Sequence, residues 1–457
     1  MTPAPAARPA VPGHVIDRLA RTESDEETLD LLVHGQHTRR LLLLRLLHDT
    51  VTADAPAGDR SRFLDHWSLL EAAEGQGPAG RETVRSTVQH PLTGPWIRQT
   101  LADLRAGRPA DVDRLGAMAV AAGLRAGLTF TTRLHAGGEG LHLPTLGALT
   151  CPRGAVEVRS DGTWLTLRPD GASGGTRVCR QPGWGAWSAH AVWRPAVVLP
   201  PLAPGQAPVP LDDQGPYRTT DLPGTAVHPV RPASSDDAAR KSWYDVWTGE
   251  TAQLLDVGGP PRLAETGRLL RSVVPLLPPR EAGATGYCSG TRRGAFGAVH
   301  SSVPPTAVSL ASMLVHELQH AKLGALTDLV PLHRAGPERR YFAPWRPDPR
   351  PFDGLWQGIY SHLALAFWWR HCALVTPDGP AREHAWAEYA RCREQTGAVL
   401  PDLVGSEQLT YEGRRLADGM VAAHQRLQEL DPPSGHLARA RSYIQTARAL
   451  WSRAKTV

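Results

Sequence analysis

The sequence predicts an α+β protein that is mainly helical and carries a β-rich insertion in the middle of the chain. Before about residue 140 and after about residue 234, apolar residues recur at intervals of three and four, which is the period of an α-helix. Between these regions, apolar and polar residues alternate and glycine- and proline-rich turns interrupt the pattern, as is typical of strands. A chain of 457 residues is long enough for about two or three domains.

The start of the chain is predicted to be a short leader followed by helices. Residues 1–14 lack the charged-then-apolar pattern of a secretory signal, and we expect them to be a disordered leader. Residues 15–140 are expected to form an N-terminal helical region, in which Ser24 is a candidate N-cap.

Residues 141–233 are predicted to be the β-rich insertion. The stretch "GAVEVRSDGTWLTLRPDG" alternates in polarity around Asp161-Gly162, a dipeptide that favours a hairpin turn. The segment Pro200–Pro216 is rich in proline and is expected to be a loop. The insertion could bind part of a partner or cover a site, and its sequence does not distinguish these roles.

Residues 234–457 are predicted to be a helical, metal-binding catalytic region. A strand or hairpin is expected near Ala295–Ser301, followed by a helix that starts at Thr306 or at Ser302. That helix contains "HELQH", an HExxH motif, and four further helices are expected after it.

The composition argues against several classes of partner. Charged residues make up 21% of the chain, the net charge is +5 and no dense basic run occurs, so nucleic-acid binding is not expected. No apolar stretch is long enough to span a membrane. The five cysteines have no CxxC spacing, which is typical of a protein of the reducing cytoplasm, and we expect that location.

The HExxH motif at residues 316–320 is the strongest functional signal. His316 and His320 are four residues apart, so both imidazoles lie on one face of a helix and can reach one ion. Glu317 lies to the side of that face, where zinc peptidases use it as the general base for a metal-bound water. A polar patch on an ordinary helix is the alternative, which the apolar residues around the motif disfavour.

The third ligand that a peptidase needs is missing from its usual places. After His320 the sequence "AKLGALTD" lacks a further histidine at metzincin spacing, and the thermolysin-like position offers only Glu338 in a loop-like segment. Asp328 and His333 are weaker candidates. His362, 42 residues after His320 (362 − 320), lies in a strongly apolar predicted helix, where it needs either a core hydrogen bond or a metal. We prefer ligation of a metal.

Arginines lie between the two candidate ligand helices. Arg346 and Arg350 belong to the proline-punctuated, aromatic segment "RRYFAPWRPDPRPFDGLW", and each can present two parallel donors to a carboxylate. They could also be ordinary surface arginines. Their position predicts that they hold an anionic co-substrate beside the metal.

Two stretches carry a resemblance to a known family. "LVHELQHAKLGALTDLVPL" and "YFAPWRPDPRPFDGLWQGIYSHLAL" resemble the HExxH-motif peptide-modification proteins of bacterial ribosomal-peptide (RiPP) clusters, some of which are α-ketoglutarate-dependent peptide β-hydroxylases. The resemblance covers mainly Ala295–Trp369 and extends weakly to His34–Leu47. The β-rich insertion has no clear match to the family.

The resemblance implies a non-haem Fe(II) site with α-ketoglutarate and O2 as co-substrates. His316 and His320 would then be ligands, with His362 our choice as the third, and Glu317 would orient its neighbours instead of acting as a base. Arg346 or Arg350 would bind the distal carboxylate of α-ketoglutarate. The implied partners are a ribosomally made precursor peptide and other enzymes of the same cluster. A zinc metallopeptidase and a non-catalytic maturation partner are the competing hypotheses.

Overall fold

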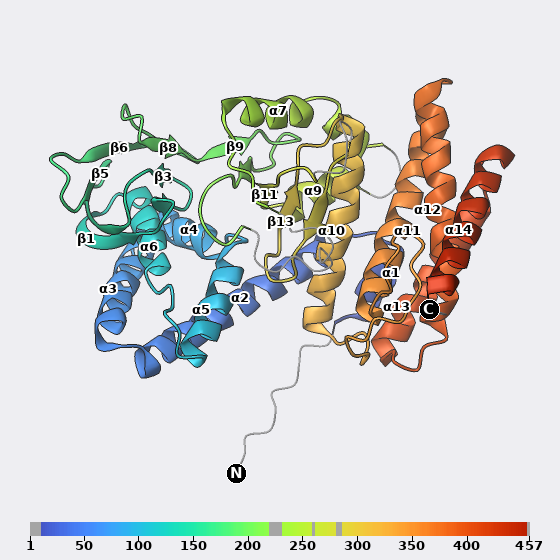
Figure 1. Ribbon diagram of the computed structural model, residues 1–457, viewed down its shortest axis with the longest axis horizontal. Helices are drawn as coiled ribbons and strands as arrows, with labels where there is room; N and C mark the ends of the chain where they lie inside the picture. The colour runs from blue at the N-terminus through green and yellow to red at the C-terminus, as the bar shows by residue number, and fades with distance from the viewer. Residues whose placement is uncertain (1–10, 219–230, 258–260, 280–285, 455–457) are drawn as a thin grey trace, which may run out of the picture.

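The computed structural model describes residues 11–218, 231–257, 261–279 and 286–454, and these residues form the mainly helical α+β fold that the sequence predicts (Figure 1). The helices are α1 (Gly13–Ala20), α2 (Glu26–Asp54), α3 (Ala57–Glu74), α4 (Gly77–Val88), α5 (Thr93–Arg105), α6 (Arg114–Arg125), α7 (Asp237–Thr248), α8 (Thr251–Leu255), α9 (Arg262–Leu269), α10 (Ala307–Leu329), α11 (Phe352–Val375), α12 (Pro380–Val404), α13 (Tyr411–Gln428) and α14 (Ser434–Ala454). The strands are β1 (Thr129–Ala136), β2 (Leu141–Leu143), β3 (Gly147–Leu149), β4 (Gly154–Asp161), β5 (Trp164–Pro169), β6 (Thr176–Arg180), β7 (Ala186–Trp187), β8 (Trp193–Pro195), β9 (Val197–Leu199), β10 (Val209–Leu211), β11 (Ser272–Pro275), β12 (Ser289–Thr291) and β13 (Ala298–Ser301).

The strands form three sheets. An antiparallel sheet has the order β1-β4-β5-β6-β7, and a small sheet has the order β2-β3-β8. The third sheet, β12-β13-β11-β10-β9, is mixed, because β11 is parallel to both β10 and β13. The predicted hairpin is confirmed: β4 and β5 turn at Asp161, whose carboxylate accepts the N–H groups of Thr163 and Trp164.

The helices pack on two sides of the long helix α2. Figure 1 shows α3–α6 and the first sheets at one end of α2, and α10–α14 at the other end. At the second end, α11 is buried along most of its length and contributes Trp356, Tyr360 and Trp368 to the largest core. No helix in the described ranges combines the length and the apolarity needed to cross a bilayer.

The N-terminus differs from the prediction in two ways. Residues 1–10 of the predicted leader lie outside the described residues, whereas α1 already begins at Gly13 and buries Val15 and Ile16. Ser24 is not the N-cap of α2; Asp25 is, and its side chain accepts the N–H of Thr28. The hydroxyl of Ser24 instead donates to a buried carboxylate on α9, a long-range contact that the local sequence does not reveal.

The strands do not follow the predicted limits of the insertion at residues 141–233. β1 begins earlier, at Thr129, inside the predicted helical region, because "TFTTRLHA" is rich in β-branched and aromatic residues and pairs along its length with β4. β9 and β10 belong to the same sheet as β11 and β13. The predicted insertion is therefore not a separate unit, although its residues 219–230 lie outside the described ranges.

Candidate functional site

Helix α10 carries the HExxH motif and begins at one of the two predicted residues. Thr306 is its N-cap, with a side chain that accepts the N–H of Ser309. Leu310, Leu314 and Leu318 are buried against the largest core, which fixes the rotation of the helix. The two motif histidines therefore project toward α11, which packs beside α10.

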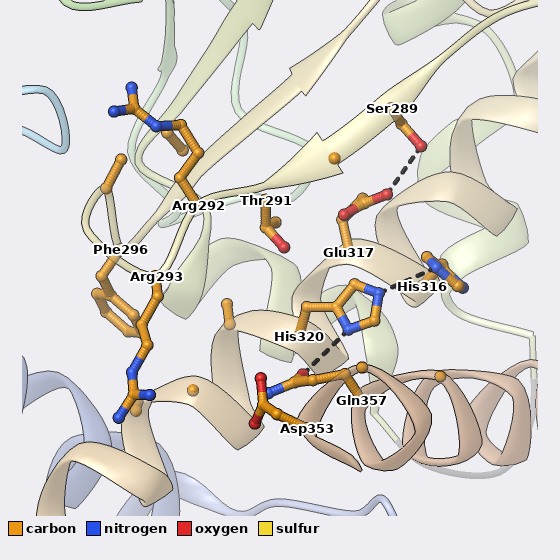
Figure 2. Close-up of a pocket in the computed structure, with 18 of the residues that line it drawn as sticks. Ser289, Thr291, Arg292, Arg293, Phe296, His316, Glu317, His320, Asp353 and Gln357 are labelled. Carbon is orange, nitrogen blue, oxygen red and sulfur yellow. Dashed lines mark hydrogen bonds between the residues drawn. The ribbon is translucent and has the colours of Figure 1, made fainter. Parts of the chain in front are cut away.

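The two motif histidines meet at their Nε2 atoms. These atoms are 3.1 Å apart, and Nδ1–H of His320 donates to Oε1 of Gln357 at 3.1 Å (Figure 2). The contact with Gln357 leaves Nε2 of His320 as the atom with a lone pair. Two nitrogens bound at right angles to one ion, each about 2.1 Å away, would be about 3 Å apart, so the spacing of this pair fits a shared metal.

His362 on α11 lies beside this pair. Its ring is perpendicular to that of His316, with the centroids 5.4 Å apart. Its Nδ1–H donates to the carbonyl oxygen of Gly358 at 2.8 Å, and this bond leaves Nε2 unprotonated. The indole of Trp345 stacks on the other side of the ring, with centroids 4.5 Å apart and planes 20° apart. The orientation of His362 is thus set from two directions.

The donor set is assembled in part. Among the described residues, no three His, Cys, Asp or Glu side chains stand together in ready metal-binding geometry. His316 and His320 are the assembled pair, and His362 is the adjacent third imidazole. Burial lowers the pKa of His362 to about 3, and burial together with the neighbouring imidazoles lowers the pKa of His316 well below its usual value. Both imidazoles are therefore neutral at pH 7, the form that binds metals.

Glu317 is buried beside the histidines, with 2% of its surface exposed. Its Oε1 accepts the hydroxyl of Ser289 at 2.8 Å, whereas Oε2 makes no hydrogen bond of good geometry with the residues that the structure describes (Figure 2). Burial raises the pKa of this carboxyl group, against the opposing effects of His320 and Ser289. Thr291 also lowers the pKa of Glu317, and both residues line the cavity, where Oε2 can accept a hydrogen bond from a ligand.

One cavity of about 370 Å³ brings all six predicted site residues together. It is lined by His316, Glu317, His320, Arg346, Arg350 and His362. The weaker ligand candidates Asp328, His333 and Glu338 do not line it. Asp328 is instead paired with Arg39 and Arg293, and His333 contacts Asp353.

The two predicted carboxylate-binding arginines share one counterion. Asp348 accepts Nε of Arg346 at 2.9 Å and Nη1 of Arg350 at 3.3 Å. The side chain of Arg350 is 14% exposed, and its Nε has no hydrogen-bond partner among the residues that the structure describes. Both arginines line the cavity, where their fork-shaped donors suit a carboxylate ligand.

Several residues of the cavity were not predicted from the sequence. Gln357 supports His320, Ser289 supports Glu317, and Trp345 supports His362. A signal existed for one of them, since Gln357 lies close to His362 on the same apolar helix. Ser289 lies 28 residues before Glu317 on β12, and no local pattern links the two.

Strand β12 forms an edge of the mixed sheet next to the cavity. Ser289, Gly290 and Thr291 all line the cavity, and β12 pairs with β13 on one side only within the described ranges. Such an edge has backbone N–H and C=O groups that can pair with an extended peptide.

The comparisons with known proteins add no family assignment. No protein-family model matches the chain, and a search of curated proteins finds no significant match.

Proposed function

We propose that the protein is a non-haem Fe(II)- and α-ketoglutarate-dependent hydroxylase that modifies a side-chain carbon, in our view the β-carbon, of a ribosomally made precursor peptide. The observation that supports this proposal most is the content of the cavity. Three imidazole side chains, two arginines and an edge strand surround the same space of about 370 Å³.

Each residue of the site would have a distinct role. His316, His320 and His362 would hold the iron, which leaves positions for a keto acid and for oxygen. When bound, Fe(II) with α-ketoglutarate and O2 supplies the oxidising power to replace a C–H bond with C–OH, giving succinate and CO2. Arg350, with Arg346 beside it, would pair with the distal carboxylate of the keto acid. Gln357, Trp345 and Gly358 would hold the imidazoles in position.

The proposed partner is an extended peptide. The open edge of β12 can pair with its backbone, and side chains of a paired strand point alternately to the two faces of the sheet. Every second side chain would then face α10, and its β-carbon is the first side-chain atom to reach the histidines. The other enzymes of the same biosynthetic cluster are proposed as further partners, and the cytoplasm as the location. The five cysteines, all in the described ranges, are free thiols, which fits a reducing compartment.

The test uses purified protein, Fe(II), α-ketoglutarate and the precursor peptide encoded beside its gene. We expect succinate release that requires all three components, and a peptide whose mass increases by that of one oxygen atom. His316→Ala should abolish both signals, while His333→Ala, a histidine outside the cavity, should retain them. A shortened peptide with no added oxygen would instead identify a peptidase. An unmodified peptide, together with normal peptide maturation when the His316→Ala variant replaces the protein, would identify a non-catalytic partner.

One observation favours zinc peptidase activity as a second candidate. Oε2 of Glu317 makes no hydrogen bond with the described residues, and in an HExxH peptidase the glutamate of the motif is the general base for a metal-bound water. Glu317→Gln separates the two functions, because a peptidase loses its base and about 10²–10⁴-fold in rate. For the hydroxylase we expect a loss of about tenfold or less, since the residue would only orient its neighbours.

A further inference from the structure

Four arginines surround the turn between β12 and β13, which forms the wall of the cavity opposite His316. The turn comprises residues 292–297, and Figure 2 shows Arg293 and Phe296 on this side. The four are Arg39 on α2, Arg98 on α5, Arg271 just before β11 and Arg293 in the turn itself, and we call them the arginine cluster.

Specific contacts hold the arginine cluster around the turn. Nη1 of Arg98 donates to the carbonyl oxygen of Gly294 at 3.0 Å. The side chain of Arg271 packs against Gly297, where a Cβ atom would lie only 2.7 Å from its Cγ. Arg39 and Arg293 both reach the same oxygen of Asp328, at 2.6 Å each. The four side chains thus reach the turn from four segments, and Arg293 also lines the cavity.

The arginine cluster has too few counterions. Asp328, whose side chain is 3% exposed, pairs with Arg39 and Arg293, and Arg293 also lowers the pKa of Asp353, which leaves an excess of 4 − 2 = 2 positive charges within the described ranges. Glu82 attracts Arg271 from a distance but is itself paired with Arg85. Burial, and then the repulsion of Arg39 and Arg293, lowers the pKa of Arg98. An external anion would relieve this repulsion.

The guanidinium groups are accessible to a ligand. The side chains of Arg39 and Arg293 are 42% and 52% exposed, and Arg98 and Arg271 are partly exposed. The excess is also local, because the whole chain has a net charge of only +5 over 457 residues. A compact cluster at a cavity mouth suits a short run of carboxylates better than the long, evenly charged backbone of a nucleic acid.

We propose that the arginine cluster binds an acidic segment of the peptide substrate next to the residue that enters the cavity. The inference rests on the proposed function, since it takes the ligand of the cavity to be a peptide. It assigns the recognition of flanking acidic residues to Arg39, Arg98, Arg271 and Arg293. The cluster acts as a docking site and takes no part in the reaction.

The test measures the binding of two labelled decapeptides by fluorescence anisotropy, without metal or keto acid. One probe alternates glutamate and glycine, and the other alternates glutamine and glycine. At about 50 mM salt the acidic probe should bind at least about tenfold more tightly, and the difference should disappear at about 500 mM salt, where charges are screened. Arg271→Gln/Arg293→Gln should remove most of the difference, and it leaves the pair of Arg39 and Asp328 intact.

The control is Arg133→Gln/Arg159→Gln, which removes the same charge from β1 and β4, where both side chains are exposed. It should change binding of the acidic probe less than about twofold. Equal binding of the two probes by the unmodified protein, or an equal loss in the control variant, overturns the proposal. So does tighter binding of double-stranded DNA, or of phosphatidylserine vesicles, through the same arginines. Because the assay omits the reaction, failure of hydroxylation and failure of acidic docking are distinguishable.

Discussion

The indole of Trp345 stacks on the imidazole of His362, with ring centroids 4.5 Å apart and planes only 20° apart. The hydrogen bond from Nδ1 of His362 to Gly358 acts on the same ring from within α11. The loop before α11 and the helix itself therefore fix one imidazole together, and their contacts determine whether it can join His316 and His320 at a metal.

Removing the stacking ring should weaken the metal site. We expect Trp345→Leu to lower Fe(II) affinity about tenfold, because the His362 ring loses the surface that orients it. Anaerobic equilibrium dialysis measures this affinity. Trp187→Leu, at a tryptophan that is 53% exposed on β7, is the matched control and should not change it. Equal affinities of the Trp345 variant and the unmodified protein would show that the stack has no role in ligation.

Gly358 leaves room for the same indole. A Cβ atom at this position would lie 2.3 Å from a ring carbon of Trp345, so Gly358→Ala must displace the indole. We expect a loss of about 1–3 kcal/mol in the free energy of unfolding, together with weaker metal binding.

The control for this variant is Gly324→Ala on α10, where the nearest heavy atom to a new Cβ is 3.9 Å away. That substitution should be neutral or stabilise the protein by up to about 1 kcal/mol, because alanine favours a helix. Urea unfolding measures the free energy of unfolding of both variants. The same change in stability for both variants would contradict the packing argument.

Arg350 should dominate binding of the keto acid. Its Nε has no hydrogen-bond partner in the part of the chain that the structure describes, so a carboxylate would complete its hydrogen bonds. We expect Arg350→Gln to raise the α-ketoglutarate concentration for half-maximal succinate release about 10- to 100-fold. Asp348→Asn should lower it, because Asp348 competes for both arginines. Arg340→Gln, ten residues away in the same loop, should leave this concentration unchanged. If Arg340→Gln and Arg350→Gln raised it equally, Arg350 would have no specific role in binding the keto acid.

A buried ion cluster behind the site should make stability sensitive to acid. Glu265 accepts Lys322 and Arg262, both at 2.8 Å, and all three side chains are nearly inaccessible. Burial raises the pKa of Glu265, but the two cations outweigh this effect and hold it at about 2. The folded pKa is below the unfolded value of 4.5, so the stabilising contribution is complete above about pH 4.5 and is lost as the pH falls toward 2.

A shift of this size corresponds to about 3 kcal/mol in the free energy of unfolding. At pH 7 we expect Glu265→Gln to be destabilised by about 3–5 kcal/mol, since it leaves two buried cations without a carboxylate. The difference in the free energy of unfolding between Glu265→Gln and the unmodified protein should become smaller as the pH falls from 4.5 to 2, as measured by urea unfolding. Glu74→Gln, at an exposed residue of α3, should show no such pH dependence. A difference that stays constant with pH would contradict this account of Glu265.

The local parts of the fold and the site were predictable, and the non-local parts were not. The helical period places His316 and His320 on one face, and the apolar helix around His362 indicated a buried polar group, which the structure locates in the same cavity. The pairing of β10 with β11 across about 60 residues left no local pattern, so the sequence did not reveal that strands on both sides of residue 233 share one sheet. The contact of Ser289 with Glu317 and the stacking of Trp345 on His362 were not predictable for the same reason. Each contact joins segments that are separate in the sequence and meet only in the folded protein.

The central claim is that the cavity holds Fe(II) and α-ketoglutarate together. Its most direct test is anaerobic equilibrium dialysis of α-ketoglutarate against the purified protein with Fe(II), with Zn(II) and without metal. We predict about one keto acid per chain when Fe(II) is present, far weaker binding without metal, and none in His316→Ala. The claim would be contradicted if keto acid binding did not depend on a metal or on His316. It would also be contradicted if the protein retained only Zn(II) and cleaved the peptide.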